Sequence, residues 1–304
     1  MPVVSIRHRT SYRYRNPVAF GEHRVMYRPL ESYDQRVVAA ALDVGPEPAM
    51  VRHVQEASGA TVAVTRFDAR ADRLQFESQV TVDHTPETAF ELEGEAAAIG
   101  AGPFDYHEEE AADLARAIVR QHPDDAGDVE AWARRYVRPV GRTRLSTLLA
   151  DMTHGIRGDL TYATRLDGPP QSPLETLERR TGSCRDFAVL MAEAARSLGL
   201  AARFTSGYVY SGSLKAGRTG GGHTHAWVRV YLPGCGWTDF DPTNGIVGGQ
   251  DLIRVAEVVN PRAALPLHGA WSGLKSDFLG MDVEVDVNVC EATQPAAVSR
   301  VAHG

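Results

Sequence analysis

The period of the hydrophobic pattern changes once along this chain, and that change limits the folds the chain can adopt. Through residues 3–82, apolar and polar side chains alternate in short stretches that turn-forming residues separate. Alternation with a period of two is typical of half-buried β-strands, and many short strands favour an antiparallel sandwich. The predicted strands cover residues 3–14, 23–27, 36–44, 50–56, 61–67 and 74–82. We therefore expect an N-terminal β domain at residues 1–95.

A helical period replaces this alternation after a small-residue segment at 93–103. Apolar residues then recur every third or fourth position, as on one face of an amphipathic helix. The predicted helices cover residues 108–121, 128–137, 143–156 and 184–198, the last ended by Gly199. Strand signals return near residue 225. The sequence thus predicts an α+β chain in which an antiparallel β-sandwich precedes a mixed core at 104–290, with a tail at 291–304.

Charge and composition disfavour several classes of protein. The formal net charge is −7 over 304 residues, without a long run of like charge. This balance argues against binding to nucleic acid or to a membrane surface. No segment approaches the ~20 apolar residues of a membrane span, and the first residues lack an apolar leader, so we expect a cytoplasmic protein. Three cysteines at wide spacing argue against a disulfide framework.

One of these cysteines, Cys184, lies at the predicted start of a helix. Ser183 and Asp186 fit the capping pattern S-x-x-D, which places Cys184 in the first helical turn. The unpaired N–H groups and the positive dipole end of a helix favour an anion there, and Arg185 adds positive charge. Both effects favour the thiolate, which is the nucleophilic form of cysteine. A buried structural cysteine that happens to fall at a cap is the alternative.

A predicted hairpin supplies the side chains that a thiol nucleophile needs. His225 lies on its first strand as a base, and Asp241 ends its second strand as the acid that orients the base. In a hairpin without a bulge, the numbers of any two paired residues add up to the same total. A four-residue loop at 233–236 would place the two side chains on opposite faces, so the loop must have an odd length or contain a bulge. Asp239 shares the face of Asp241, so parity does not choose between them.

Three segments then resemble bacterial cysteine peptidases of the transglutaminase-like superfamily. They are SPLETLERRTG (172–182), GSCRDFAVLMAEAARSLGLAARFTSGYV (182–209) and HAWVRVYLPGCGWTDFDPTNG (225–245), with Tyr162 ahead of them. The stretch IRHRTSYRYRNPV (6–18) is similar to the β-rich domain that often precedes this core in bacteria. The resemblance extends to about residue 290.

The resemblance implies a papain-like core in which a helix carrying the nucleophile packs on an antiparallel sheet. It also implies the roles of the triad: Cys184 as nucleophile, His225 as base and then acid, and Asp241 as orienter. The chain departs from the family pattern at Arg229, where relatives carry an acidic residue, at Val189, where they carry His, and at 258–261, where they show a G-R-D-Y stretch.

The expected reaction is acyl transfer on a peptide or amide bond through a thioester, without a cofactor. Hydrolysis is favoured because water is abundant, whereas transamidation by a transglutaminase requires its exclusion. A non-catalytic module that retains the cleft is one alternative. A metal site using His223, His225, Cys235 and Asp241 is another, although no known ligand spacing frames it.

Four further residues are expected to line the substrate cleft: Tyr208, Trp227, Arg229 and Trp237. The expected partner is a peptide or protein substrate, and the N-terminal β domain is a possible docking surface for another protein. The substrate itself and the oligomeric state do not follow from the sequence.

Overall fold

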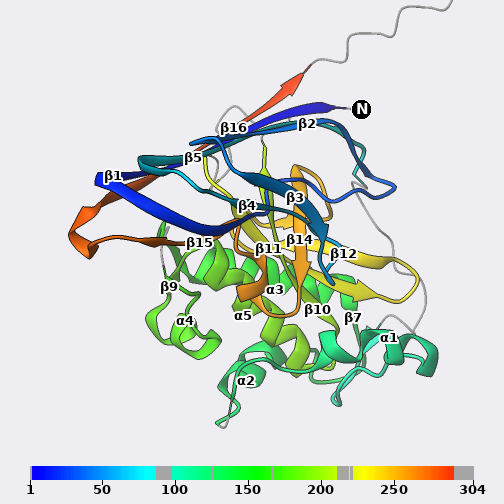
Figure 1. The fold of residues 1–304 in the computed structure, drawn as a ribbon. Helices are drawn as coiled ribbons and strands as arrows, with labels where there is room; N and C mark the ends of the chain where they lie inside the picture. The colour runs from blue at the N-terminus through cyan, green and yellow to red at the C-terminus, as the bar shows by residue number, and fades with distance from the viewer. Residues whose placement is uncertain are drawn as a thin grey trace, which may run out of the picture.

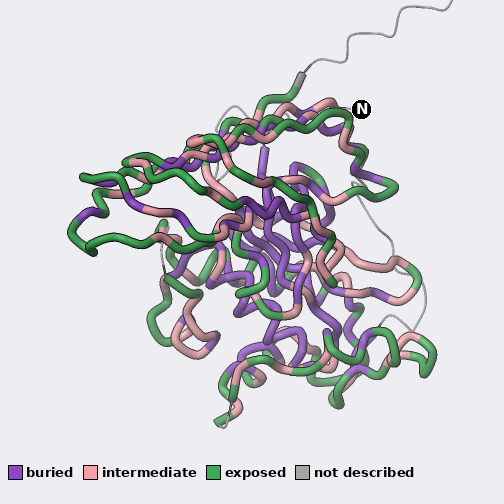
Figure 2. The backbone as a smooth tube through the Cα atoms, in the orientation of Figure 1, coloured by how far each residue is buried: buried purple, intermediate pink, exposed green. Residues whose placement is uncertain are grey.

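The computed structural model describes residues 2–86, 98–124, 126–165, 168–210, 219 and 222–290. Two large antiparallel sheets and a layer of helices make up most of this part of the chain, and two short two-stranded sheets accompany them: β6 (Ala98–Ile99) with β7 (Thr143–Arg144), and β8 (Thr161–Tyr162) with β9 (Thr181–Gly182). A seven-stranded sheet lies at the top of Figure 1, a five-stranded sheet crosses the middle, and most of the helices lie below it. Buried residues gather in the centre, around the five-stranded sheet and the adjacent helix (Figure 2). The predicted α+β class is confirmed.

The seven-stranded sheet is built around one long strand. It contains β1 (Val3–Val25), β2 (Gln35–Gly45), β3 (Met50–Gln55), β4 (Thr61–Arg66), β5 (Arg70–His84), β15 (Leu267–Ser272) and β16 (Phe278–Cys290). Strand β1 pairs with β5 and β16 along its first half, and with β4 and β15 near its end. Its predicted alternation is observed: Ile6 and His8 are buried, while Arg7 pairs with Glu77 at 2.8 Å on the more exposed face.

The N-terminal region is not the two-sheet sandwich that the sequence predicts. The N-terminal strands form a single curled sheet, because the 23 residues of β1 are enough to pair with four other strands. The layer packed against that sheet is the core itself: Ile6 and Val80 share one apolar cluster with Phe204 and Ile253. Strands β15 and β16 also return from the far end of the chain to this sheet. The predicted range 104–290 therefore contributes strands to both sheets, while the tail at 291–304 lies outside the described residues.

The five-stranded sheet has the order β13-β12-β11-β10-β14. Its strands are β10 (Ala202–Val209), β11 (His225–Leu232), β12 (Gly236–Asp241), β13 (Ile246–Val247) and β14 (Leu252–Val258). Every neighbouring pair is antiparallel. Strand β11 is central, and its residues Val228 and Val230 pack into the cluster formed with the helices. The hairpin β11–β12 is thus held rigidly in the middle of the molecule.

Four α-helices of the described residues form where the period of the sequence predicts them, whereas the helix at Pro173–Arg179 was not predicted. In chain order, the helices are α1 (Glu108–Ile118), α2 (Asp128–Arg134), α3 (Leu145–Asp159), α4 (Pro173–Arg179) and α5 (Cys184–Ser197). Helix α1 ends before the predicted residue 121, where the N–H groups of Gln121 and His122 donate to the buried Glu193 carboxylate instead. Helix α3 starts at Leu145, because Thr143 and Arg144 form β7 and pair with β6 (Ala98–Ile99).

Helix α5 lies between the five-stranded sheet and the other helices. Its Leu190 and Met191 pack with Leu148 and Met152 of α3, and its Ala188 packs toward the seven-stranded sheet. A helix that is buried on most sides is fixed by tertiary packing at both ends.

Among the described residues, no helix has the length and hydropathy of a membrane-crossing segment.

Candidate active site

The start of helix α5 is fixed by a buried carboxylate. Oδ2 of Asp186 accepts hydrogen bonds from the backbone N–H of Ser183 at 2.7 Å and from its hydroxyl at 2.8 Å. The other oxygen, Oδ1, accepts from Arg165 at 2.6 Å and from the backbone N–H of Gln171 at 2.7 Å. Burial alone would raise the pKa of Asp186, but these donors lower it. The predicted capping box is therefore present, and it determines where the helix begins.

Cys184 is the first residue of α5, as predicted, and its side chain is almost enclosed, with 8% of the residue exposed. At this position the thiol faces the positive end of the helix dipole, which favours an anion. The guanidinium of Arg185 donates to the carbonyl oxygens of Gly168 and Arg165, at 2.8 Å each. Arg185 thus ties the segment around residue 168 to the start of the helix.

The hairpin that carries His225 and Asp241 satisfies the parity requirement. Leu232 pairs with Gly236, so the loop contains three residues, an odd number. Gly234 and Gly236 both adopt positive φ, 82° and 76°, which such a short loop needs. The two side chains consequently share a face, and Nε2 of His225 lies 2.8 Å from Oδ2 of Asp241.

Asp241 is surrounded by hydrogen-bond donors. Its Oδ1 accepts from the backbone N–H of Thr243 at 2.9 Å and of Asn244 at 3.3 Å. Its Oδ2 accepts from Nδ2 of Asn244 at 2.7 Å as well as from His225. Burial would raise the pKa of Asp241, but His225, Asn244 and Thr243 lower it, so the carboxylate remains ionised. Asn244 is a residue of the site that was not predicted from the sequence, although the turn D-P-T-N-G after a strand is typical of such side-chain-capped turns.

His225 joins the two halves of the candidate site. Burial would lower its pKa, but the Asp241 carboxylate and then the neighbouring Cys184 sulfur raise it well above the ordinary value. Among the described residues, Nδ1 of His225 has no partner within hydrogen-bond limits, so the sulfur is adjacent to the ring rather than firmly bonded to it. Tyr162 lies close to the same groups: burial and then the Cys184 charge raise the pKa of its phenol.

A cavity of about 600 Å³ opens at Cys184 and His225. The core contributes Tyr162, Phe204 and Ser206 to its walls, and the segment that follows β14 contributes Pro261 and Arg262. The opposite wall comes from the seven-stranded sheet, with residues of β1, β15 and β16: His8, Thr10, Tyr12, Leu267, Met281 and Val283. The N-terminal region is thus part of the pocket that contains the candidate nucleophile.

None of the four predicted cleft residues is among the described residues that line this cavity. Trp227 is buried beneath His225, and Tyr208 is buried with its hydroxyl 3.0 Å from Nδ1 of His8. Arg229 forms ion pairs with Asp239 and Glu257 within the sheet, and Trp237 lies under Arg203 at 4.0 Å. Trp227 and Arg229 occupy every second position after His225 along β11, but Trp227 is buried and Arg229 is paired within the sheet, so neither reaches the cavity.

The candidate metal ligands do not form a cluster in the described part of the chain, where no three His, Cys, Asp or Glu side chains are arranged to hold an ion. His223 and His225 both line the cavity. Cys235, in contrast, is in the hairpin loop and packs against the helical cluster.

Comparisons with known proteins match the two regions separately. Residues 4–83 match the bacterial transglutaminase-like N-terminal region, and residues 131–242 match the transglutaminase-like superfamily. An uncharacterized protein of Mycobacterium leprae is 32% identical over 130 residues, covering 42% of this chain and 46% of that protein. An uncharacterized protein of Mycobacterium tuberculosis is 29% identical over 297 residues, covering 93% of this chain and 91% of that protein. The chain thus spans less than half of the first relative and most of the second.

Among solved structures, a candidate cysteine protease from Cytophaga hutchinsonii has the same fold. It superposes with a TM-score of 0.69 at 18% identity, covering 96% of this chain and 91% of that one. The fold is therefore shared across both sheets and the helical layer. The core at residues 131–242 thus belongs to the transglutaminase-like superfamily, and residues 4–83 form a bacterial transglutaminase-like N-terminal region.

Proposed function

We propose that this protein hydrolyses peptide or amide bonds by thiol-dependent acyl transfer, with Cys184, His225 and Asp241 as the catalytic triad. One observation carries the proposal: Nε2 of His225 lies 2.8 Å from the Asp241 carboxylate, next to a thiol at a helix start and in the wall of a cavity. Burial would lower the pKa of His225, but the neighbouring charges raise it. A protonated imidazole beside a sulfur favours the thiolate form, because each charge stabilises the other.

In the first half of the reaction, the Cys184 thiolate attacks the carbonyl carbon of the substrate. The carbonyl oxygen becomes an oxyanion, and the backbone N–H of Cys184 is the donor we assign to it, since the first amides of a helix have no intrahelical acceptor. When the tetrahedral intermediate collapses, the C–N bond breaks and His225 gives its proton to the leaving amine. A thioester on Cys184 and a neutral imidazole remain.

In the second half, water attacks the thioester while His225 accepts its proton. The C–S bond breaks, the acid product leaves, and the thiolate–imidazolium pair is restored. Asp241 keeps the proton-bearing nitrogen of His225 oriented throughout, because its Oδ2 accepts from Nε2. Attack by an amine instead of water would make the same site a transamidase.

Alkylation with iodoacetamide, followed by mass spectrometry across a pH series, tests the proposal before any substrate is known. Cys184 should already react rapidly at pH 6, because the thiolate is the nucleophilic form of cysteine, and His225→Ala should abolish that reactivity. Cys235, partly exposed in the hairpin loop, is an internal reference thiol in every sample. If Cys184 reacts no faster than Cys235 at pH 6, the proposal is refuted.

Substrate screening then distinguishes the two outcomes of the thioester. Peptide and amide libraries would be incubated with the wild type and with Cys184→Ser, with and without a primary amine. Release of acid product that the added amine does not divert supports hydrolysis, whereas stable amine adducts would identify a transamidase.

A further inference from the structure

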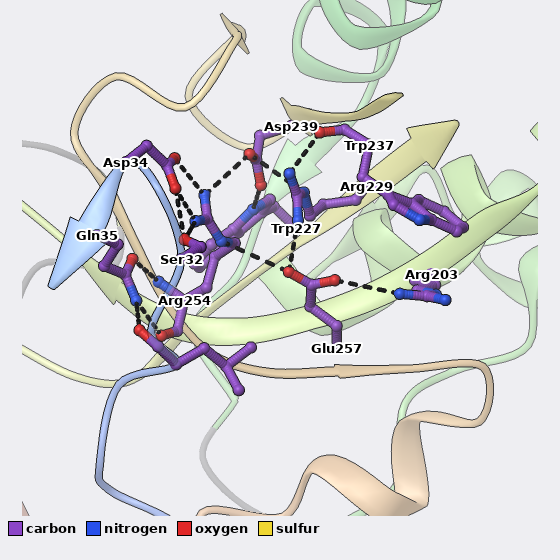
Figure 3. Close-up of polar contacts among 11 residues, drawn as sticks. Ser32, Asp34, Gln35, Arg203, Trp227, Arg229, Trp237, Asp239, Arg254 and Glu257 are labelled. Atoms are coloured by element: carbon purple, nitrogen blue, oxygen red, sulfur yellow. Dashed lines mark hydrogen bonds and ion pairs between the residues drawn. The ribbon is translucent and has the colours of Figure 1, made fainter. Parts of the chain in front are cut away.

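A chain of buried polar contacts connects the N-terminal region to the strand that carries His225 (Figure 3). It begins at Asp34, just before β2, whose carboxylate meets the guanidinium of Arg254 in β14. Nη2 of Arg254 lies 2.6 Å from Oδ1 of Asp34, and Nη1 lies 3.0 Å from Oδ2. Both residues are buried, and two-point pairing of this kind fixes direction as well as distance.

The same N-terminal segment also binds the backbone of Arg254. Oε1 of Gln35 accepts from its N–H at 2.9 Å, and Nε2 of Gln35 donates to its carbonyl at 2.8 Å. The hydroxyl of Ser32 accepts from Nη2 of Arg254 at 2.7 Å. One short segment of the N-terminal region therefore determines both the strand position and the side-chain direction of Arg254.

From Arg254 the contacts lead to His225 in three steps. Nη1 of Arg254 lies 3.5 Å from Oδ2 of Asp239 in β12. The other oxygen, Oδ1 of Asp239, accepts a hydrogen bond from Nε1 of Trp227 at 2.6 Å. The indole of Trp227 stacks against the imidazole of His225, with 5.9 Å between centroids and 26° between planes. Trp227 is fully buried, so this hydrogen bond leaves the ring one orientation behind the imidazole.

Charges within the network balance. Its three guanidiniums and three carboxylates belong to Arg203, Arg229, Arg254, Asp34, Asp239 and Glu257. Burial would lower the pKa of Arg254, but Asp239 and Asp34 raise it; Arg254 in turn holds the pKa of Asp34 at about 2. Both groups are thus fully ionised at neutral pH. A buried ion pair adds little net stability, but removing one member leaves an uncompensated charge.

We propose that Asp34 is a positioning residue for the active site, acting through Arg254, Asp239 and Trp227 on the orientation of His225. The inference rests on the proposed function, because it assigns Asp34 an effect on the thiolate–imidazolium pair. The other groups that face His225 are Cys184 from α5, Asp241 at the end of β12, and Asn244 in the turn that follows. Tyr162 lies near the same groups, because besides its burial the charges of Cys184 and Asp241 raise the pKa of its phenol. Asp34 is in contact with none of these, so its effect must pass through the indole.

The test compares Asp34→Asn with Glu193→Gln in the full chain. Both substitutions remove one buried carboxylate from an arginine pair, and Glu193 pairs with Arg196 at 2.5 Å on the same helix as Cys184. Both should therefore lower the melting temperature. Only Asp34→Asn should slow the alkylation of Cys184 at pH 6, by about tenfold or more, since small misplacement of a catalytic group costs up to ~100-fold.

Trp227→Phe provides the second measurement, because it keeps an aromatic ring against His225 and removes the N–H donor to Asp239 together with part of the indole. If both variants act through one chain of contacts, the double variant should lose no more reactivity than the worse single variant. Additive losses, wild-type alkylation in Asp34→Asn, or equal slowing in Glu193→Gln would each overturn the inference. A different result would refute the proposed function itself: wild-type Cys184 that is alkylated no faster than Cys235. The inference about Asp34 would then fail as well.

Discussion

Replacing Asp241 by Asn should disable Cys184 without changing the size of any side chain. Every described group that contacts the Asp241 carboxylate through a hydrogen bond is a donor: the backbone N–H groups of Thr243 and Asn244, the amide of Asn244, and Nε2 of His225. An asparagine NH₂ at this position would have no acceptor. His225 can accommodate it only by accepting at Nε2, which moves its proton to Nδ1. The nitrogen next to the sulfur could then no longer take the thiol proton.

The size of the effect follows from the geometry. Two unit charges 2.8 Å apart attract by about 6 kcal/mol at an effective dielectric constant of ~20. Desolvation offsets part of this, and removing one partner of a buried pair costs about 3–5 kcal/mol. At ~1.36 kcal/mol per factor of ten, the rate of Cys184 alkylation at pH 6 should fall roughly 200-fold to 5,000-fold.

The assay measures the second-order rate of iodoacetamide alkylation at Cys184 by mass spectrometry, with Cys235 as the reference thiol. A circular dichroism melt confirms that the variant is folded at the assay temperature. A folded Asp241→Asn protein that reacts within threefold of the wild-type rate would refute the reasoning, because the carboxylate would then be unnecessary for the charged pair.

Three other substitutions test separate parts of the structure. Burial lowers the pKa of His8 to about 3, below the ordinary 6.5, so the folded state binds this proton less readily than the unfolded state. The free energy of unfolding should therefore begin to fall as pH drops below about 6.5, and the loss should approach roughly 5 kcal/mol near pH 3. In urea titrations, the stability of His8→Phe should depend less on acid pH than that of the wild type. An unchanged pH dependence would contradict this. Gly207→Ala should destabilise the protein by about 3 kcal/mol, because the Cβ of the new alanine would lie 2.0 Å from the carbonyl oxygen of Ile253. An unchanged melting temperature would show that β10 and β14 can move apart at no cost in stability. Asn244→Ala removes a hydrogen bond to the Asp241 carboxylate, worth about 1.5–3 kcal/mol, and should slow Cys184 alkylation roughly tenfold to 200-fold. A wild-type rate would show that Asn244 is dispensable.

Local patterns predicted the elements and much of the candidate site. The alternation in β1 and the helical period after Cys184 both reflect which face of one element is buried, and a neighbouring stretch of chain is enough to encode that. The capping pattern located the start of α5 correctly. For His225 and Asp241 to meet, parity required either an odd hairpin loop or a bulge, and the observed loop has three residues.

Residues far apart in the sequence decided what local patterns could not. Asp34 and Arg254 are separated by 220 positions, so no periodicity links them. The cavity wall formed by His8 and Met281 depends on β1 and β16 pairing across nearly the whole chain. For the same reason Trp227 and Tyr208, predicted in the cleft, are instead buried beneath neighbouring elements.

The sequence by itself determined the α+β class and the helix start at Cys184, and it set the condition under which His225 and Asp241 share a face, because periodicity, capping and hairpin parity are local consequences of backbone geometry. Only the tertiary structure decided that the N-terminal sheet closes the cavity, that β15 and β16 complete that sheet, and that Asp34 reaches Arg254 behind the active site. Those contacts form when distant segments exclude water from a common core, and which segments meet depends on the packing of the whole chain.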